Sequence, residues 1–188
     1  MNLFDLVAPI YGRVRLNDEK TFRMIVEFGD FKKTDKVLDL GGGTARIAKF
    51  FTDIVQEITV IDASRGMIAQ CKKHIGIICI LGGAERISYS NGYFDKVIIV
   101  DAFHHFQNKE KAVKEIRRVL KENGKIIIEE VDFGKLGNWF LEKLETIAGT
   151  KSKILSPQSL VELFSKNQFR TRLVKESRTG YYLIGEKG

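Results

Sequence analysis

The chain has 188 residues, 44% of them apolar and 29% charged, which is typical of a single globular domain with a sizeable core. No apolar run approaches the roughly 18 residues that span a bilayer. The N-terminal segment, which carries Asp5, lacks the apolar core of a signal peptide, so we expect a cytoplasmic protein without a membrane span. The net charge of +7 is compatible with nucleic acid, an acidic small molecule or an anionic membrane surface as partner. It is also compatible with no specific partner, because the basic residues are interleaved with acids.

The two cysteines, Cys71 and Cys79, do not have the spacing of a redox motif or of a zinc site. One lies in a helical pattern and the other in an apolar run that reads as buried. We therefore expect both to be reduced, as cysteines of cytosolic proteins usually are, and we predict no metal site.

The first 30 residues have the pattern of two short helices, which we expect to form an N-terminal cap. Strands and helices then alternate through a core at residues 35–131. Short apolar runs predict buried strands at residues 37–41, 57–62, 76–81, 94–101 and 125–131. Helical patterns occupy residues 44–51, 64–73 and 109–120, with Ser64 as a plausible N-cap. Such strands, separated by helices, predict an open, doubly wound α/β fold with helices on both faces of a parallel sheet.

The last third of the chain has a different pattern. Residues 132–156 are irregular and could form a cap over the substrate. Pro157 suits the first turn of a helix at residues 157–166. Two strands at 169–175 and 179–185 follow, joined by a short turn, and predict an antiparallel pair at one edge of the sheet. No linker or repeat divides residues 1–188, so we expect one domain.

A glycine-rich loop, Asp39-Leu40-Gly41-Gly42-Gly43, follows the first predicted strand and opens the next helical pattern. Glycines there allow a tight turn and a close approach of a ligand to the backbone. The carboxylate of Asp39 would repel the pyrophosphate of a dinucleotide but would attract an ammonium group. The loop therefore fits the methionine end of S-adenosylmethionine better than NAD.

A second carboxylate, Asp62, ends the second predicted strand. It can accept hydrogen bonds from both hydroxyls of a ribose, or it can cap the helix that follows. Met67, one turn into that helix, either packs on an adenine ring or belongs to the core.

Gly83, Ala84 and Glu85 follow the third predicted strand. Backbone groups there could contact the edge of an adenine, and Glu85 could instead be a surface residue.

The fourth predicted strand ends in Asp101, with His104 and His105 three and four residues later. In open parallel sheets, ligands bind outside the carboxyl ends of the strands, and all of these candidate positions fall on that edge. One of the histidines could orient a substrate or act as a general base, or both could be structural.

The segments VLDLGGGTARIA, VIDASRGMIAQCKK, GGAE and FDKVIIVDAFHHF occur in this order. Together they resemble class I S-adenosylmethionine-dependent methyltransferases, and in particular the branch that includes the ubiquinone and menaquinone C-methyltransferases. The resemblance implies a Rossmann-like, seven-stranded sheet with one antiparallel strand near the C-terminus. It also implies a role for each matching residue. The methionine moiety would contact Asp39, Gly41, Gly42 and Gly43; the ribose and adenine would contact Asp62, Ala63, Met67, Gly83, Ala84 and Glu85; and Asp101 would lie near the sulfonium.

The resemblance further implies direct methyl transfer to an acceptor, most simply a small molecule. Candidate general bases are His104, His105 and, near the N-terminus, Tyr11. Alternatives remain open: an RNA methyltransferase, an NAD-dependent oxidoreductase, or a cofactor-binding partner without turnover.

Overall fold

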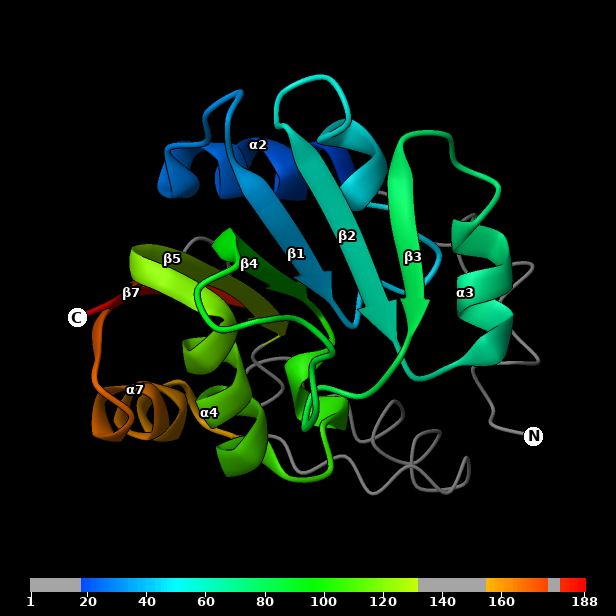
Figure 1. Ribbon diagram of the computed structural model, residues 1–188. Helices are drawn as coiled ribbons and strands as arrows, with labels where there is room; N and C mark the ends of the chain where they lie inside the picture. Colours follow the sequence, from blue (N-terminus) through cyan, green and yellow to red (C-terminus); the bar gives the residue numbers. More distant parts are fainter. Residues whose placement is uncertain (1–17, 132–154, 176–179) are drawn as a thin grey trace.

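A seven-stranded sheet forms the centre of the computed structural model, which describes residues 18–131, 155–175 and 180–188 (Figure 1). The strand order is β3-β2-β1-β4-β5-β7-β6. Five strands are parallel: β1 (Lys36–Leu40), β2 (Glu57–Asp62), β3 (Ile77–Leu81), β4 (Phe94–Val100) and β5 (Leu120–Val131). The strand β7 (Gly180–Lys187) runs antiparallel between β5 and β6 (Phe169–Lys175). This confirms the predicted mostly parallel sheet with an antiparallel strand near the C-terminus.

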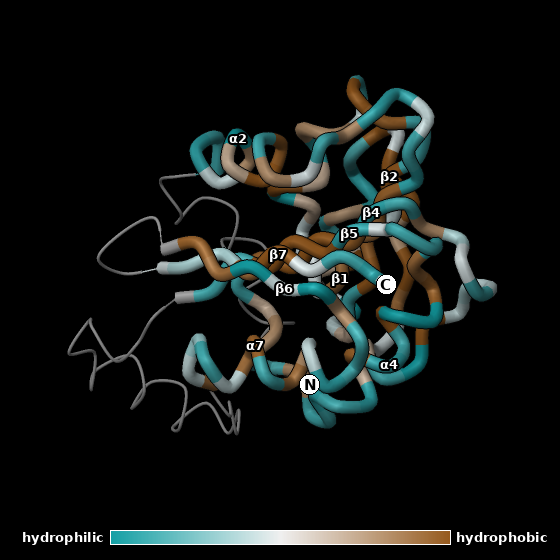
Figure 2. Tube along the Cα trace, turned by 90° about the vertical axis from the view of Figure 1, so that its left-hand side faces the viewer, coloured by the Kyte–Doolittle hydropathy of each residue, from teal (hydrophilic) through white to brown (hydrophobic). Residues whose placement is uncertain are grey.

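Helices cover both faces of this sheet (Figure 2). One face carries α2 (Asp18–Gly29), and the opposite face carries α4 (Lys109–Val119) and α7 (Pro157–Lys166). A short helix, α3 (Arg65–Cys71), joins β2 to β3. Among the described residues, no helix is long and apolar enough to cross a membrane.

The alternation of side chains along each strand divides the core into two clusters. Val37, Ile98 and Ile127 belong to the cluster that includes Ile25 of α2. Their sequence neighbours Leu38, Val97, Ile99, Ile126 and Ile128 belong to the cluster that includes α4 and α7. Strands that are apolar on both faces are the reason that the sheet is covered on both sides.

Three predicted elements differ in the structure. Residues 44–51 form turns and a short 3₁₀ helix, η1 (Ala48–Phe50), instead of a regular helix, because Ala45 has a φ of 65°, which an α-helix does not allow. The strand β5 begins at Leu120 and not at residue 125, with a left-handed residue, Asn123, inside it. The strand β3 is only partly buried, with Ile78 43% exposed, because it lies at the edge of the sheet.

The prediction of two reduced cysteines is wrong in the structure. Cys71, the last residue of α3, and Cys79, in the middle of β3, form a disulfide with their Cα atoms 6.1 Å apart. The turn between helix and strand folds back on itself, and this brings two cysteines eight residues apart within bonding range.

Of the two predicted N-terminal helices, α2 is present. The first helix, Tyr11 and most of the possible cap at residues 132–156 lie outside the described residues.

Candidate functional site

A pocket opens at the carboxyl ends of β1 and β4. It is lined by the glycine loop with its neighbours on one side and by the end of β4 on the other: Asp39, Gly41, Gly42, Gly43, Thr44, Arg46, Ile47, Val100 and Asp101. This is the sheet edge at which the sequence predicts a ligand site, and the strand order places β1 and β4 next to each other there.

The glycine loop is tightly enclosed. A Cβ atom on Gly41, which has a φ of 77°, would lie 2.7 Å from the Cβ atom of Ala102. A Cβ atom on Gly42 would lie 2.5 Å from the carboxyl carbon of Asp39. At Gly43, with a φ of 57°, the nearest neighbour would be the Met67 sulfur at 3.6 Å. Close contacts thus exclude a side chain at Gly41 and Gly42. The left-handed backbone conformation disfavours a side chain at Gly41 and Gly43.

The carboxylate of Asp39 is buried, and the nearby Arg46 charge offsets only part of the effect of burial. The residue is only 1% exposed, and neither carboxylate oxygen has a hydrogen-bond partner among the described residues. Burial raises the pKa of Asp39 to about 7, with the nearby Arg46 guanidinium lowering it and the Asp62 carboxylate raising it further. Buried carboxylates normally have partners, so this one is suited to receive an ammonium group from a ligand.

Asp62 comes from the end of β2 and holds the glycine loop. Its Oδ2 accepts a hydrogen bond from the Gly43 backbone N–H at 3.0 Å, and its Oδ1 accepts one from the Ser64 N–H at 2.8 Å. Ser64 is the predicted N-cap of α3, and its hydroxyl oxygen accepts from the Met67 N–H. Asp62 therefore joins the end of β2 to both the glycine loop and the start of α3. Met67 is buried beside it, and Ala63 is exposed.

The segment after β3 is anchored to the next helix. Ala84 is buried in the cluster beneath α4, and Gly83 is half-buried. Glu85 accepts a hydrogen bond from the Asn108 N–H, which immediately precedes α4, at 3.1 Å. Glu85, which is half-buried, therefore ties the segment after β3 to the start of α4.

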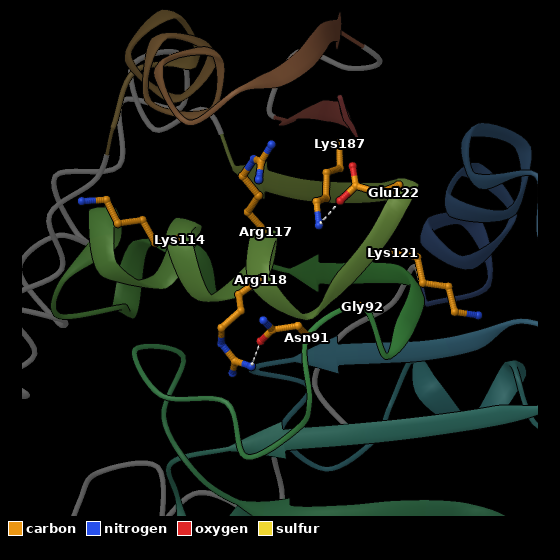
Figure 3. A pocket seen from close by; sticks show the side chains of 8 residues that line it. All are labelled: Asn91, Gly92, Lys114, Arg117, Arg118, Lys121, Glu122 and Lys187. Atoms are coloured by element: carbon orange, nitrogen blue, oxygen red, sulfur yellow. Dashed lines mark hydrogen bonds and ion pairs between the residues drawn. The ribbon is translucent and has the colours of Figure 1, made fainter.

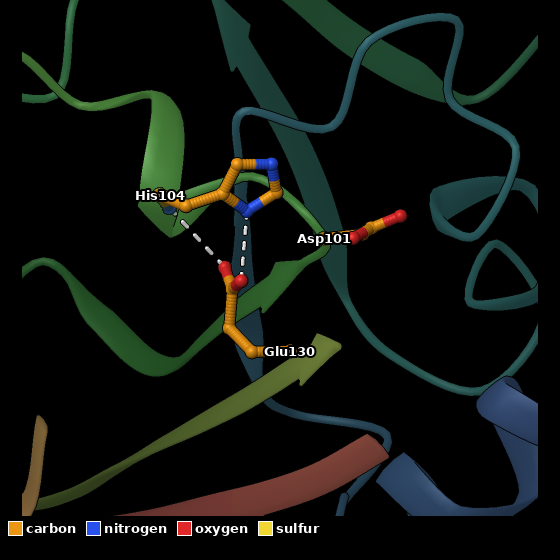
Figure 4. Close-up of side chains that lie close together, drawn as sticks. All are labelled: Asp101, His104 and Glu130. Atoms are coloured by element: carbon orange, nitrogen blue, oxygen red, sulfur yellow. Dashed lines mark hydrogen bonds and ion pairs between the residues drawn. The ribbon is translucent and has the colours of Figure 1, made fainter. Parts of the chain in front are cut away.

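Asp101 of the pocket lining also belongs to a buried cluster with His104 and Glu130 (Figure 4). Asp101 follows β4 with a φ of 55°, and its N–H donates to the carbonyl of Glu129. Glu130 Oε1 accepts from the backbone N–H groups of Phe103 and His104, and Glu130 Oε2 lies 2.7 Å from His104 Nδ1. His104 is thus directed at β5, and the ring of the half-buried His105 lies beside it with centroids 3.9 Å apart.

The sequence analysis missed Glu130. One sequence signal could have identified it. Glu130 continues the alternation of the buried Ile126 and Ile128 near the carboxyl end of an apolar strand, so its carboxylate is expected on a buried face. The three side chains offer oxygen and nitrogen atoms within 4.8 Å of one another, as a metal site would. However, both carboxylate oxygens of Glu130 are already used by N–H groups, so a metal would have to displace those hydrogen bonds. The contacts fit a hydrogen-bonded pair better than a set of metal ligands.

A second hollow lies at the opposite, amino end of β4 and is lined by basic side chains (Figure 3). Most of these cations have acidic partners: Arg118 pairs with Glu115, Lys121 with Asp95, and Lys187 with Glu122. These pairs account for much of its charge, and the hollow is separate from the glycine loop.

Comparisons with known proteins agree with this geometry. Residues 38–128 match the family described as "Methyltransferase domain". The uncharacterised methyltransferase YcgJ of Bacillus subtilis is 31% identical over 59% of this chain and 49% of its own length. A demethylmenaquinone methyltransferase of Thermotoga maritima is 30% identical over 70% of this chain and 61% of its own length. The chain thus spans about half to three fifths of the length of these curated relatives.

The crystal structure of YcgJ superposes with a TM-score of 0.77 at 18% identity, covering 90% of this chain and 98% of that one, which shows the shared fold. Residues 38–128 are therefore similar to the methyltransferase domain family, and the fold is shared with YcgJ. The chain is also 32% identical, over 60% of its own length, to a ubiquinone/menaquinone biosynthesis C-methyltransferase of Wigglesworthia glossinidia brevipalpis.

Proposed function

We propose that this chain transfers the methyl group of S-adenosylmethionine directly to a small-molecule acceptor. The observation that carries the proposal is the buried Asp39 carboxylate, which has no hydrogen-bond partner among the described side chains and backbone groups and lies against the Gly42 backbone. A cationic amino group placed there would neutralise it. NAD would instead bring a pyrophosphate to this loop, next to a carboxylate.

The residue assignment is part of the proposal. Asp39 and the glycines Gly41, Gly42 and Gly43 would hold the methionine end. Asp62 and Ala63 would lie against the ribose, and Met67, Gly83, Ala84 and Glu85 around the adenine. Asp101 would lie near the sulfur. The contacts of Asp62 and Met67 with Gly43 support this order, because they bring the end of β2 and the start of α3 against the glycine loop.

For this reaction the protein mainly has to align the acceptor atom with the methyl group and to exclude water from the site. The cofactor, when bound, supplies a methyl carbon that is already activated by its positive sulfur. The acceptor atom would bond to that carbon as the carbon–sulfur bond breaks, S-adenosylhomocysteine would leave, and a proton of the acceptor would pass to a base. His104, oriented by Glu130, and His105 are the described candidates for this base, and Tyr11 remains a candidate by resemblance.

The similarity to quinone methyltransferases supports a small acceptor. The basic hollow gives weak support to an RNA acceptor, since most of its cations have acidic partners. Incubation with bulk RNA and labelled cofactor addresses that alternative: salt-sensitive binding together with methyl incorporation would replace the small-molecule proposal.

Calorimetry with S-adenosylhomocysteine and with NAD tests the central proposal. We expect binding of the former and none of the latter. The Asp39→Asn variant should bind S-adenosylhomocysteine at least 10-fold more weakly. The matched control is Asp95→Asn, because Asp95 is a carboxylate at the other end of the strands, bonded to Lys36 N–H and Lys121. Tight binding of NAD alone would refute the proposal.

A further inference from the structure

We propose that Arg46 binds the carboxylate of the methionine moiety, so that Asp39 and Arg46 together recognise a zwitterion. This inference rests on the proposed function, because it concerns the same cofactor site. Arg46 lines the same pocket as Asp39 and Gly42, seven residues further along the chain. Its side chain is only 11% exposed, so its charge is held at the pocket and not in solvent.

The electrostatics of the pocket connect the two residues. The Arg46 charge is the main influence that lowers the pKa of Asp39 against the effect of burial. The pocket therefore presents one negative and one positive group close together. An α-amino acid end carries the opposite pair, an ammonium and a carboxylate, so each ligand charge would find a partner of opposite sign.

The guanidinium has donors available for such a ligand. In the part of the chain that the structure describes, its hydrogen bond is from Nη1 to Oδ1 of Asp18, the first residue of α2. A guanidinium has five N–H donors in a planar fork that matches a carboxylate. One bond to Asp18 leaves the rest of the fork able to bind a second carboxylate.

The competing interpretation is that Arg46 only joins the glycine loop to α2 through Asp18. Ligand chemistry separates the two. S-Adenosylhomocysteine carries both the ammonium and the carboxylate, whereas its decarboxylated analogue, S-adenosyl-3-thiopropylamine, keeps the ammonium alone. A carboxylate-binding residue affects only the first ligand, and a structural residue affects both.

The experiment is calorimetric titration of both ligands into the wild-type chain and into Arg46→Gln, Arg46→Lys and Asp18→Asn. We expect the wild type to prefer S-adenosylhomocysteine by roughly 10- to 100-fold, the range of a charge-assisted hydrogen bond. Arg46→Gln should lose this preference while binding the decarboxylated analogue as before. Arg46→Lys should keep part of it, because an ammonium supplies the charge without the fork. Asp18→Asn breaks the ion pair but keeps the guanidinium, so the preference should persist.

Equal weakening of both ligands in Arg46→Gln, or an unchanged preference in that variant, would overturn the assignment while leaving the proposed function intact. A loss of preference in Asp18→Asn equal to that in Arg46→Gln would also overturn it, in favour of the structural role. If the wild-type chain binds neither ligand, the proposed function itself fails, and this assignment with it. The melting temperature of each variant shows whether it is folded. If Arg46→Gln is not folded, Arg46→Lys takes its place in the comparison of the two ligands.

Discussion

The Oε2 atom of Glu130 lies 2.7 Å from Nδ1 of His104, and both side chains are buried. The other oxygen of Glu130 accepts two backbone N–H groups of the segment that follows Asp101. One carboxylate on β5 therefore fixes the conformation of the chain between β4 and α4.

Removing this carboxylate should be costly. Glu130→Ala would leave three buried donors without an acceptor, and we expect it to lower the free energy of unfolding by about 3 kcal/mol. Glu130→Gln keeps one carbonyl acceptor and should cost less. Urea titration measures both, with Glu129→Gln as the control on the neighbouring residue. A loss below about 1 kcal/mol for Glu130→Ala would show that water or a shift of the loop replaces these bonds.

The stability of the ligand-free chain should depend on pH through Asp39. Its pKa of about 7 in the folded state lies above the ordinary value of 3.8, so between these values the folded state holds a proton that the unfolded state has lost. The contribution of this group is therefore fully present below pH 3.8 and is lost as the pH rises to about 7. Asp39→Asn should remove this decline. Denaturant unfolding from pH 5 to pH 8 compares the two proteins, and parallel curves would contradict the raised pKa.

Binding of S-adenosylhomocysteine should show the opposite trend. The ligand ammonium needs the ionised form of Asp39, so affinity should rise by up to about 10-fold per pH unit up to about pH 7 and then level off. In Asp39→Asn the affinity should be low and nearly independent of pH over this range. Calorimetry at fixed ionic strength measures both profiles, and a pH-dependence shared by the two proteins would assign the effect to another group.

The glycine loop can be tested with a matched pair of variants. Gly41 and Gly92 both have left-handed backbone, with φ of 77° and 63°, so an alanine at either should cost about 1–2 kcal/mol in stability. Only Gly41→Ala also places a methyl group against Ala102 at the site. We expect Gly41→Ala alone to weaken S-adenosylhomocysteine binding, by more than 10-fold. Equal binding by the two variants would mean that the loop tolerates a side chain there.

The disulfide between Cys71 and Cys79 should stabilise the fold. Closing a loop of this length restricts the unfolded chain by about 2–3 kcal/mol on the chain-entropy model. Dithiothreitol should lower the free energy of unfolding of the wild type by that amount and have no effect on Cys79→Ser. Thiol titration of the unreduced, denatured chain should find no free thiol; two thiols would show that the bond does not form.

The sequence predicts the sheet well because its strands carry strong local signals: short apolar runs, each closed by a glycine or a carboxylate. It predicts Asp39, Asp62 and Asp101 at one edge for the same reason, since parallel strands end together. It does not predict the turns after Thr44, where the left-handed Ala45 overrides a helical pattern. Glu130 and the Cys71–Cys79 pair depend on which segments meet in space, and no spacing along the chain encodes that.

The position of β7 has a consequence for synthesis of the chain. Residues 180–187 form an inner strand, bonded to β5 on one side and β6 on the other. Strands β1 to β5, which carry the glycine loop and its carboxylates, have all been translated by residue 131. While the rest is made, β5 presents an unpaired edge, which invites pairing with other nascent chains. Ribosome-bound intermediates that end before residue 180 should therefore be the species most dependent on chaperones.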